Sequence, residues 1–249
     1  MKAIIIAAGA GTRLGNITKD IPKPLVDING KSLIERQILL LRKNNVKDIV
    51  IVTGYKKEKF IFKDIEYIHN PNFLEQEQIG SLMTARSKII GDVLIMFGDI
   101  LFDETILQQM LNSKDDIGIA IDEDWEKSYD ERLDNPKSKA DKVLIKNKKI
   151  IQISAKNIKI EKKNIIGELL GIMKLSSKGS KILIEQYEKL ENEHIGKFHD
   201  AISLQKAKFV DILQELLSLS NGITPISIKG KWCEIDTPDD LKRAKKKFR

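Results

Sequence analysis

A glycine-rich turn followed by two cations stands near the start of the chain, where AAGAGTRLGNITKDIPKPL spans residues 7–25. Gly9 and Gly11 permit positive φ and lack the Cβ atoms that would block a ligand, so backbone N–H groups can point at phosphate oxygens. Arg13 follows at once, and Lys23 lies between two prolines that restrict its backbone. We therefore expect this loop to bind a polyphosphate.

Two better-known phosphate loops are excluded by the residues that follow the glycines. The dinucleotide fingerprint requires a third glycine where Leu14 stands, and Gly15 comes one place too late. The P-loop requires a Gly-Lys-Ser/Thr ending, which this loop lacks. A plain strand-to-helix turn is the alternative, but Arg13 and the proline-framed Lys23 favour a phosphate site.

Acidic residues at the ends of apolar segments could hold a divalent metal ion. Asp99 follows VLIMFG (93–98), at the edge of an open sheet where ligands bind. In KWCEID, a period of two puts Trp232, Glu234 and Asp236 on one face of a strand. Mg²⁺ held by one or two carboxylates commonly neutralises phosphate charge in group transfer. The pattern is therefore compatible with a magnesium site.

Helix capping is the alternative role for both aspartates. Asp99 precedes a helix-like segment, although Asp103 lies closer to its start. Asp236 precedes Thr237, which is a suitable N-cap, and Pro238 fits the first turn of a helix. On the residues alone, both interpretations stay open.

The segments that carry these residues alternate between strand-like and helix-like patterns. Short, fully apolar strands separated by amphipathic helices predict a parallel sheet covered on both faces. We expect an α/β fold of three α/β/α layers, Rossmann-like, with a mixed but mainly parallel sheet. The expected strands are 2–7, 48–53, 65–70, 93–98 and 117–122, and the expected helices are 32–44, 79–89 and 104–111.

The pattern changes after residue 122. Segment 123–141 is polar and rich in turn residues, which indicates a lid or an insertion. We expect one domain, 1–249, made of a nucleotide-binding core (1–122), a lid segment (123–175) and a C-terminal part (176–249). Beyond the lid we expect a hairpin around 146–149, a strand at 165–175, helices near 177–192 and 202–219, a hairpin-like strand pair and a final helix.

Composition excludes several classes of protein. The net charge is +7, but the basic residues are interleaved with acids, and the one dense run at 242–249 fits a solvated helix end and tail. We therefore expect no nucleic-acid partner. A single Cys233 and three scattered histidines argue against disulfides and zinc. MKAIIIAAG is expected to be a core strand and not a signal peptide, and no stretch is long and apolar enough for a membrane span, so we expect a cytoplasmic protein without a membrane partner.

The combination of motifs resembles a known family. GAGTRL, the later IPKPL, a strand that ends in Gly-Asp and a late Glu-Ile-Asp resemble nucleotidyltransferases that join an NTP to a phosphorylated small molecule, in the sugar-phosphate nucleotidyltransferase superfamily with its GT-A-like fold. The narrower resemblance is to cytidylyltransferases that act on phosphocholine and on phosphonates such as 2-aminoethylphosphonate. The stretches that carry it are 76–85, 121–125, 167–172 and 231–241.

The resemblance implies roles for particular residues, with CTP as a substrate, Mg²⁺ as a cofactor and a homodimer as one possible assembly. Arg13 and Lys23 would be catalytic, and Asp99 and Asp236 would hold the metal. The residues expected to bind the nucleotide are Ala8, Gly9, Gly11, Thr12, Gln78 and Ser81. Those expected to bind the acceptor are Asp122, Trp125, Tyr129, Glu168, Asp200, Trp232 and Glu234, with Arg132, Lys142 and Lys156 as candidates for its phosphate.

The acceptor residues are expected to act partly as a cage for a cation, because both tryptophans stand beside acids and aromatic faces attract quaternary ammonium groups. The implied reaction is in-line attack of an acceptor phosphate or phosphonate oxygen on the α-phosphorus of CTP, with release of pyrophosphate. An ionised oxygen needs no general base, so catalysis would rest on positioning and electrostatics. Two alternatives stay open: a sugar 1-phosphate acceptor with UTP or dTTP, and a nucleotide-sensing module without activity.

Overall fold

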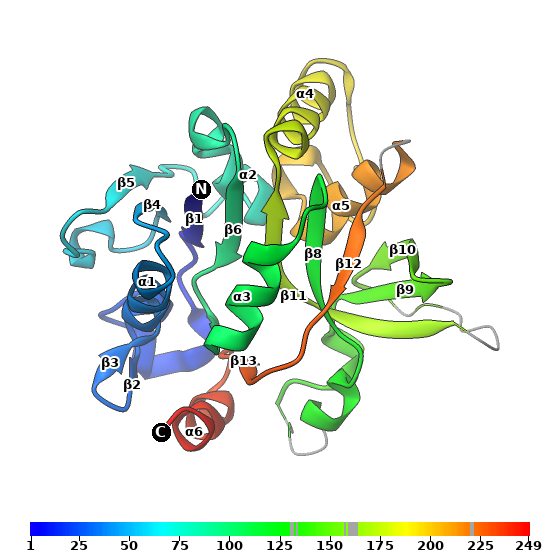
Figure 1. Ribbon diagram of the computed structural model, residues 1–249. Helices are drawn as coiled ribbons and strands as arrows, with labels where there is room; N and C mark the ends of the chain where they lie inside the picture. Colours follow the sequence, from blue (N-terminus) through cyan, green and yellow to red (C-terminus); the bar gives the residue numbers. More distant parts are fainter. Residues whose placement is uncertain (130–131, 133, 157, 159–163, 220–221) are drawn as a thin grey trace.

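A twisted central sheet forms the middle of the protein (Figure 1). The computed structural model describes residues 1–249 apart from 130–131, 133, 157, 159–163 and 220–221. The strands of the sheet follow the order β10-β9-β11-β6-β1-β4-β5, with β8 paired to β11 and β12 paired to β8. The strands are β1 (Lys2–Ala7), β4 (Asp48–Thr53), β5 (Glu66–His69), β6 (Val93–Phe97), β8 (Ile117–Asp122), β9 (Lys142–Lys146), β10 (Lys149–Ser154), β11 (Ile165–Leu175) and β12 (Thr224–Ser227).

The direction of the strands confirms a mixed, mainly parallel sheet. β1 pairs in parallel with β4 and β6, and β4 pairs in parallel with β5. β11 is antiparallel to both β6 and β8, so β8 runs in the same direction as β6, and β12 follows it in parallel. The β9–β10 hairpin forms as expected and extends the sheet beyond β11.

Strand β11 bends where Gly171 adopts a φ of 69°. The register with β8 shifts between Leu169 and Met173, as in a β-bulge. A Cβ atom on Gly171 would lie 2.3 Å from the ring of Phe97, so glycine at this position lets the ring fit against the strand. Phe97 ends β6 directly before Gly98 and Asp99, and its position therefore matters for the site described below.

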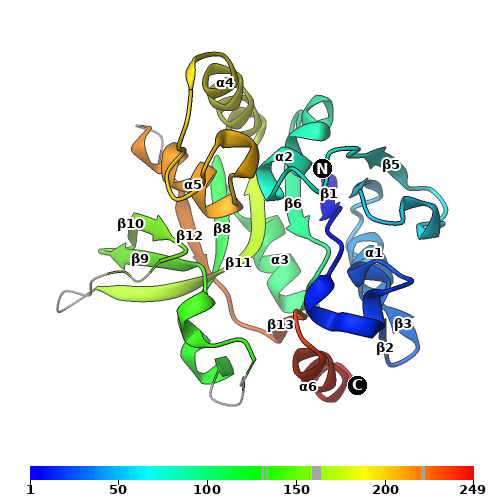
Figure 2. The ribbon, with the colours of Figure 1, turned by 180° about the vertical axis from the view of Figure 1, so that it is seen from behind.

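Helices cover both faces of the sheet, which confirms three layers. Along β1, Ile4 and Ile6 pack on one face and Ile5 on the other, as a period of two requires. Helices α2, α4 and α5 cover the first face and are seen in front of it in Figure 2; α1 and α3 cover the second. The helices are α1 (Leu33–Lys43), α2 (Gln78–Thr84), α3 (Glu104–Asn112), α4 (Ser177–Glu193), α5 (Phe209–Ser218) and α6 (Pro238–Lys247).

Two expected helices are shorter than their patterns suggested. The helix expected over 79–89 ends at Thr84 and continues as a short 3₁₀ turn. The helix expected over 202–219 begins only at Phe209, because Ser203 Oγ accepts a hydrogen bond from Lys206 N and caps a separate 3₁₀ turn. Both differences concern helix ends, where capping competes with continuation of the helix.

The expected hairpin before the final helix is wrong. β12 joins the large sheet in parallel, whereas β13 (Trp232–Glu234) pairs antiparallel with β7 (Ile100–Phe102) in a separate two-stranded sheet. The chain turns away from the large sheet because Asp103 accepts from the Lys231 backbone N–H and donates its own N–H to the Lys231 carbonyl. The apolar pattern of each strand was recognisable, but its partner depends on these distant contacts.

Small elements beside β7 complete the region around the site. β2 (Asp27–Ile28) and β3 (Lys31–Ser32) form a short hairpin, and 3₁₀ segments cover Thr12–Thr18, Lys23–Leu25 and Trp125–Tyr129. Among the described residues, none belongs to a helix with the length and hydropathy needed to cross a bilayer.

Candidate active site

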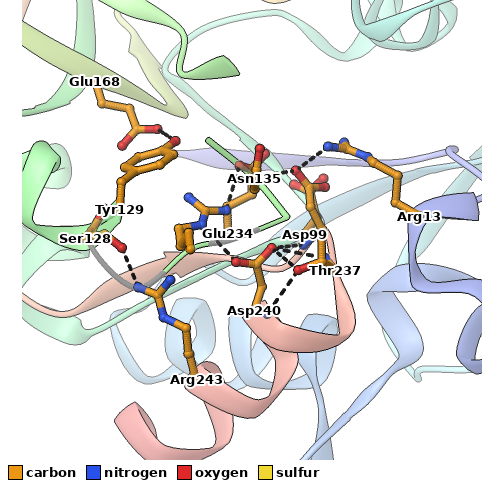
Figure 3. A network of polar contacts seen from close by, with 12 residues as sticks. Arg13, Asp99, Ser128, Tyr129, Asn135, Glu168, Glu234, Thr237, Asp240 and Arg243 are labelled. Atoms are coloured by element: carbon orange, nitrogen blue, oxygen red, sulfur yellow. Dashed lines mark hydrogen bonds and ion pairs between the residues drawn. The ribbon is translucent and has the colours of Figure 1, made fainter. Parts of the chain in front are cut away.

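Three carboxylates gather at the end of β6 and β13. Oxygen atoms of Asp99, Glu234 and Asp236 all lie within 4.8 Å of one another. The cluster forms because Glu234 pairs with Ile100 across the β13–β7 register, and the Ile235 N–H donates to the Asp99 carbonyl at 3.1 Å. Figure 3 shows Asp99 and Glu234, which come from distant parts of the chain, side by side.

Two cations neutralise this cluster. Lys23 Nζ lies 2.7 Å from Asp99 Oδ2 and 2.7 Å from Asp236 Oδ1, and Arg13 Nη1 lies 2.8 Å from Asp236 Oδ2. Burial alone would lower the pKa of Lys23, but attraction to the carboxylates outweighs it and raises the pKa above its ordinary value. Lys23 therefore stays charged.

The pKa values of two of these carboxyl groups shift in opposite directions, because the cations contact Asp236 directly. Burial, followed by repulsion from Asp236 and Asp99, raises the pKa of Glu234 well above its ordinary value. Burial would also raise the pKa of Asp236, but its contacts with Lys23 and Arg13 outweigh burial and lower it. Asp236 is consequently ionised at neutral pH and remains available as a ligand for a cation.

The cluster fits a divalent metal ion. Hard cations such as Mg²⁺ prefer carboxylate oxygens, and three are within reach of one point. Asp99 Oδ1 is buried and has no hydrogen-bond partner, so it offers a lone pair that nothing else in the described chain uses. Asp99 and Asp236 are the pair predicted from the sequence, and Glu234 lies with them.

A cavity of about 470 Å³ extends from the carboxylates along the glycine loop. Gly11 shapes its floor: its φ is 66°, and a Cβ atom there would lie 2.6 Å from Lys23 Cβ. The structure brings every residue predicted to bind the nucleotide to this cavity, namely Ala8, Gly9, Gly11, Thr12, Gln78 and Ser81, together with Arg13 and Lys23.

A second cavity of about 470 Å³ adjoins the first. Both are lined by Arg13, Gln78, Phe97 and Asp236, so the carboxylate cluster stands where they meet. The predicted acceptor residues that line the second cavity are Tyr129, Glu168, Trp232 and Glu234. The arrangement thus provides two connected binding spaces with a cation site between them.

Residues 3–135 match the profile of the MobA-like NTP transferase domain. This match covers more than half of the 249-residue chain. The chain belongs to this family. It is a nucleotidyltransferase, and the resemblance noted from its motifs is confirmed.

Individual relatives of this NTP transferase include proteins of similar length and longer ones. The chain is 28% identical over 252 residues to a CTP:phosphoglutamine cytidylyltransferase of Campylobacter jejuni, with 97% of this chain and 98% of the relative covered. It is 33% identical over 259 residues to a bifunctional protein GlmU of Methanococcus maripaludis, with 100% of this chain but only 54% of the relative covered. The chain thus spans about half the length of that second relative.

The fold of this NTP transferase also matches solved structures. A CTP:phosphocholine cytidylyltransferase from Streptococcus pneumoniae superposes with a TM-score of 0.73 at 20% identity, with 100% of this chain and 99% of that chain covered. At this identity the match concerns the fold alone. It confirms the expected nucleotidyltransferase architecture.

Glu168 is the most unusual group in the second cavity of this NTP transferase. It is 4% exposed, and one of its oxygens, Oε1, accepts a hydrogen bond from Tyr129 Oη (Figure 3). Its other oxygen, Oε2, is buried without a partner. Burial is the main cause that raises the pKa of Glu168 to about 8. A cationic ligand group that donates a hydrogen bond would favour the ionised form of Glu168 and satisfy Oε2.

Trp125 does not reach either cavity, which corrects the expected aromatic cage. Its indole N–H donates to the Ile166 carbonyl at 3.1 Å, and its ring packs edge-on against Tyr129 at 5.5 Å. With Ala140 these rings form a small apolar core under the lid segment. The expectation failed because burial of a large ring and satisfaction of its N–H were both possible inside the protein.

Other predicted acceptor residues also lie elsewhere. Asp122 accepts a hydrogen bond from Trp232 Nε1 at 2.8 Å and does not line either cavity. Asp200 forms an ion pair with Lys156 outside both cavities. Lys142 Nζ donates to the Ala140 carbonyl at 3.0 Å. These residues are therefore occupied by contacts within the protein.

Arg132 lies behind the site and does not line either of the two cavities. Its Nε donates to Asp240 Oδ1 at 2.9 Å, and its guanidinium stacks 4.5 Å from the centre of the Tyr129 ring. This contact holds Tyr129, and so it affects the second cavity indirectly.

Several lining residues were missed from the sequence, among them Phe97 and Asn135. Phe97 lines both cavities, and its place directly before Gly98 and Asp99 was a signal that could have found it. Asn135 lines the second cavity, with Nδ2 3.5 Å from Asp236 Oδ2. Nothing in the polar lid segment distinguishes this asparagine from its neighbours.

Proposed function

We propose that the protein is a cytidylyltransferase that transfers CMP from CTP to a small phosphorylated or phosphonate acceptor and releases pyrophosphate. The observation that carries the proposal is the carboxylate cluster at the junction of two equal cavities. A reaction that joins two substrates at a metal-bound phosphate needs this arrangement. The full-length relative that uses CTP supports the choice of nucleotide.

In the proposed reaction the triphosphate lies along the glycine loop. Gly9 and Gly11 direct backbone N–H groups toward phosphate oxygens, and Arg13 and Lys23 add fixed positive charge close to the junction. Asp99 and Asp236 would hold Mg²⁺, which supplies neutralisation of the charge that develops on the phosphates.

The acceptor occupies the second cavity, with its phosphoryl or phosphonate oxygen facing the junction. This oxygen is already ionised at neutral pH and attacks the α-phosphorus directly. No histidine or cysteine is among the described residues that line the two cavities. The protein therefore contributes by orienting the two substrates and by stabilising charge.

The head group of the acceptor carries a hydrogen-bond donor. Glu168 Oε2 is buried without a partner among the described residues, and an ammonium group would favour the ionised carboxylate and donate a hydrogen bond to it. A trimethylammonium has no N–H to donate, and Trp125 is turned away from the cavity. Among the acceptors expected from the sequence, 2-aminoethylphosphonate consequently fits better than phosphocholine.

A sugar 1-phosphate is the second candidate acceptor, because a sugar hydroxyl can also donate to Glu168 Oε2. The chain is also similar along its whole length to a bifunctional GlmU protein. This candidate would be accompanied by UTP or dTTP.

The test is pyrophosphate release with each of the common NTPs, crossed with a panel of acceptors. The panel contains 2-aminoethylphosphonate, hydroxyethylphosphonate, phosphocholine, phosphoglutamine, glycerol phosphate and glucose 1-phosphate. We expect release with CTP and an acceptor that carries N–H or O–H groups. Failure with CTP in every combination would overturn the proposal, and release with UTP or dTTP and glucose 1-phosphate would establish the second candidate.

A further inference from the structure

A third, much smaller cavity lies behind the carboxylate cluster, between the lid segment, β13 and α6. Its volume is about 40 Å³, which exceeds the roughly 10–15 Å³ that one water requires. Ser128 and Arg132 reach it from the lid segment, and Arg243 and Lys247 reach it from α6. We call the cavity along the glycine loop the triphosphate cavity and the second cavity the acceptor cavity, after their proposed ligands. Neither of them is lined by Ser128 or Arg243.

Three buried polar atoms of residues that line this cavity have no hydrogen-bond partner among the described residues: Ser128 Oγ, Arg132 Nη2 and Arg243 Nη1. Two of them are guanidinium nitrogens, which can only donate, and the hydroxyl can donate as well. Leaving a buried donor unpaired is unfavourable, and more so when the donor is charged. Three such atoms around one space indicate a missing group with acceptor atoms.

The acids near the cavity are already engaged. Asp240 Oδ1 accepts from Arg132 Nε at 2.9 Å, and Asp240 Oδ2 accepts from the Thr237 N–H and Oγ1, each at 3.0 Å. Glu234 Oε2 is 3.9 Å from Arg132 Nη2, which is too far for a hydrogen bond. Burial raises the pKa of the Cys233 thiol to about 12, so it contributes no negative charge. Among the described residues, these unpaired donors therefore have no anion within hydrogen-bond distance.

We propose that this cavity binds a small oxyanion, such as inorganic phosphate. The guanidinium fork matches the geometry of oxyanions, and two of the residues that line this space are arginines with an unpaired guanidinium nitrogen. Lys247, whose Nζ donates to the Trp232 carbonyl at 2.7 Å, adds positive charge to the wall.

The bound oxyanion connects the lid segment to α6. The two are already joined where Arg243 Nη2 donates to the Ser128 carbonyl (Figure 3). Ser128 directly precedes Tyr129, which lines the acceptor cavity. An occupied site thus stabilises the lid segment against thermal unfolding. The binding itself does not depend on the proposed cytidylyl transfer.

Calorimetric titration with inorganic phosphate in the presence of saturating CTP tests the proposal, because CTP fills the triphosphate cavity that would otherwise bind phosphate. Ser128→Ala is the decisive variant, since Ser128 Oγ makes no other hydrogen bond and its removal preserves the Arg243 contact. We expect Ser128→Ala to weaken phosphate binding severalfold and Arg243→Gln to weaken it about tenfold or more. Lys242→Gln, on the exposed side of α6, is the control for loss of charge and is expected to bind like the wild type.

Thermal unfolding with and without phosphate checks that the variants fold. The wild type is expected to gain stability from phosphate, and Ser128→Ala to gain less. The proposal is overturned if no phosphate binds once CTP is saturating, if Ser128→Ala and Arg243→Gln bind phosphate like the wild type, or if Lys242→Gln weakens binding as much as they do.

Discussion

Lys23 Nζ lies 2.7 Å from Asp236 Oδ1, and the same nitrogen lies 2.7 Å from Asp99 Oδ2. One ammonium thus bridges the two aspartates that we propose as metal ligands. Without a nucleotide, the lysine and a divalent cation compete for the same oxygens. When a triphosphate binds, its oxygens offer the lysine another anionic partner, so nucleotide and metal are expected to bind cooperatively.

The competition predicts opposite effects of Lys23→Met on metal binding and on turnover. In the nucleotide-free protein we expect tighter Mn²⁺ binding, because the displaced ammonium no longer neutralises Asp99 and Asp236. Turnover is expected to fall about a hundredfold or more, since a charge contact to the transition state is lost. Mn²⁺ titration by electron paramagnetic resonance and steady-state kinetics measure the two effects.

Lys19→Met is the control for this change, because Lys19 is exposed and close in sequence but does not line the cavities. It is expected to leave both quantities unchanged. Unchanged or weaker Mn²⁺ binding in Lys23→Met would contradict the competition.

Gly11→Ala is expected to disturb the same lysine by a different route. The added Cβ would lie 2.6 Å from Lys23 Cβ, so the lysine must shift away from the aspartates. We expect turnover to fall at least tenfold, because small displacements in an electrostatic site are costly. Gly91→Ala is the matched control for backbone strain, because Gly91 also has a positive φ, of 73°, but nothing lies within 4 Å of a Cβ atom added there. Equal turnover in the two variants would show that the clash with Lys23 is unimportant.

Glu168 predicts a pH dependence of stability. Its pKa is raised from 4.5 to about 8 by folding, so between these values the folded state binds more protons than the unfolded state. Its contribution to the free energy of unfolding therefore falls as pH rises through this window, by at most about 1.4 kcal/mol per pH unit. Glu168→Gln removes this contribution, and its stability relative to the wild type is expected to increase with pH across the same window.

Urea denaturation at several pH values within the window measures this difference. Glu188→Gln, on the exposed side of α4, provides the control and is expected to track the wild type. A constant difference between Glu168→Gln and the wild type from pH 4.5 to 8 would contradict the assignment.

Trp125 and Tyr129 form an edge-on pair whose members have different predicted roles. Trp125→Phe removes the donor to the Ile166 carbonyl and is expected to lower the free energy of unfolding by about 1–3 kcal/mol. The KM for the acceptor should stay unchanged. Tyr129→Phe removes the donor to Glu168 and is expected to raise that KM about tenfold. If Trp125→Phe raised the KM for the acceptor more than Tyr129→Phe does, these roles would be contradicted, and Trp125 would contact the acceptor as the aromatic cage requires.

Much of the fold was predictable because its strands are short, apolar and regularly spaced. The boundaries of β1, β4, β8 and β11 agree with the segments expected from the sequence. The pairing of β12 and β13 was not predictable in the same way. Their partners are set by contacts with Asp103 and β8, which lie about a hundred positions earlier in the chain.

The candidate site also contains some features that were predictable from local sequence and others that depend on distant contacts. The glycine loop and Lys23 are local features, so their residue types and spacing alone were enough to predict a phosphate site. The presence of Glu234 beside Asp99 depends on the register between β13 and β7, which a period of two cannot supply alone. The directions of Trp125 and Tyr129 depend on packing within a 3₁₀ segment, where no sequence period separates the buried ring from the cavity-lining one.

In the proposed reaction, an acceptor oxygen attacks the α-phosphorus of CTP where the two cavities meet, beside Asp99 and Asp236. The most direct test uses an acceptor whose phosphoryl or phosphonate oxygens carry ¹⁸O, followed by mass spectrometry of the products. We predict that all of the label is retained in a CDP-type or CMP-phosphonate product, that unlabelled pyrophosphate forms in equal amount, and that Asp236→Asn abolishes both. Label in the released pyrophosphate, or release of inorganic phosphate in place of pyrophosphate, would contradict nucleotidyl transfer at this site.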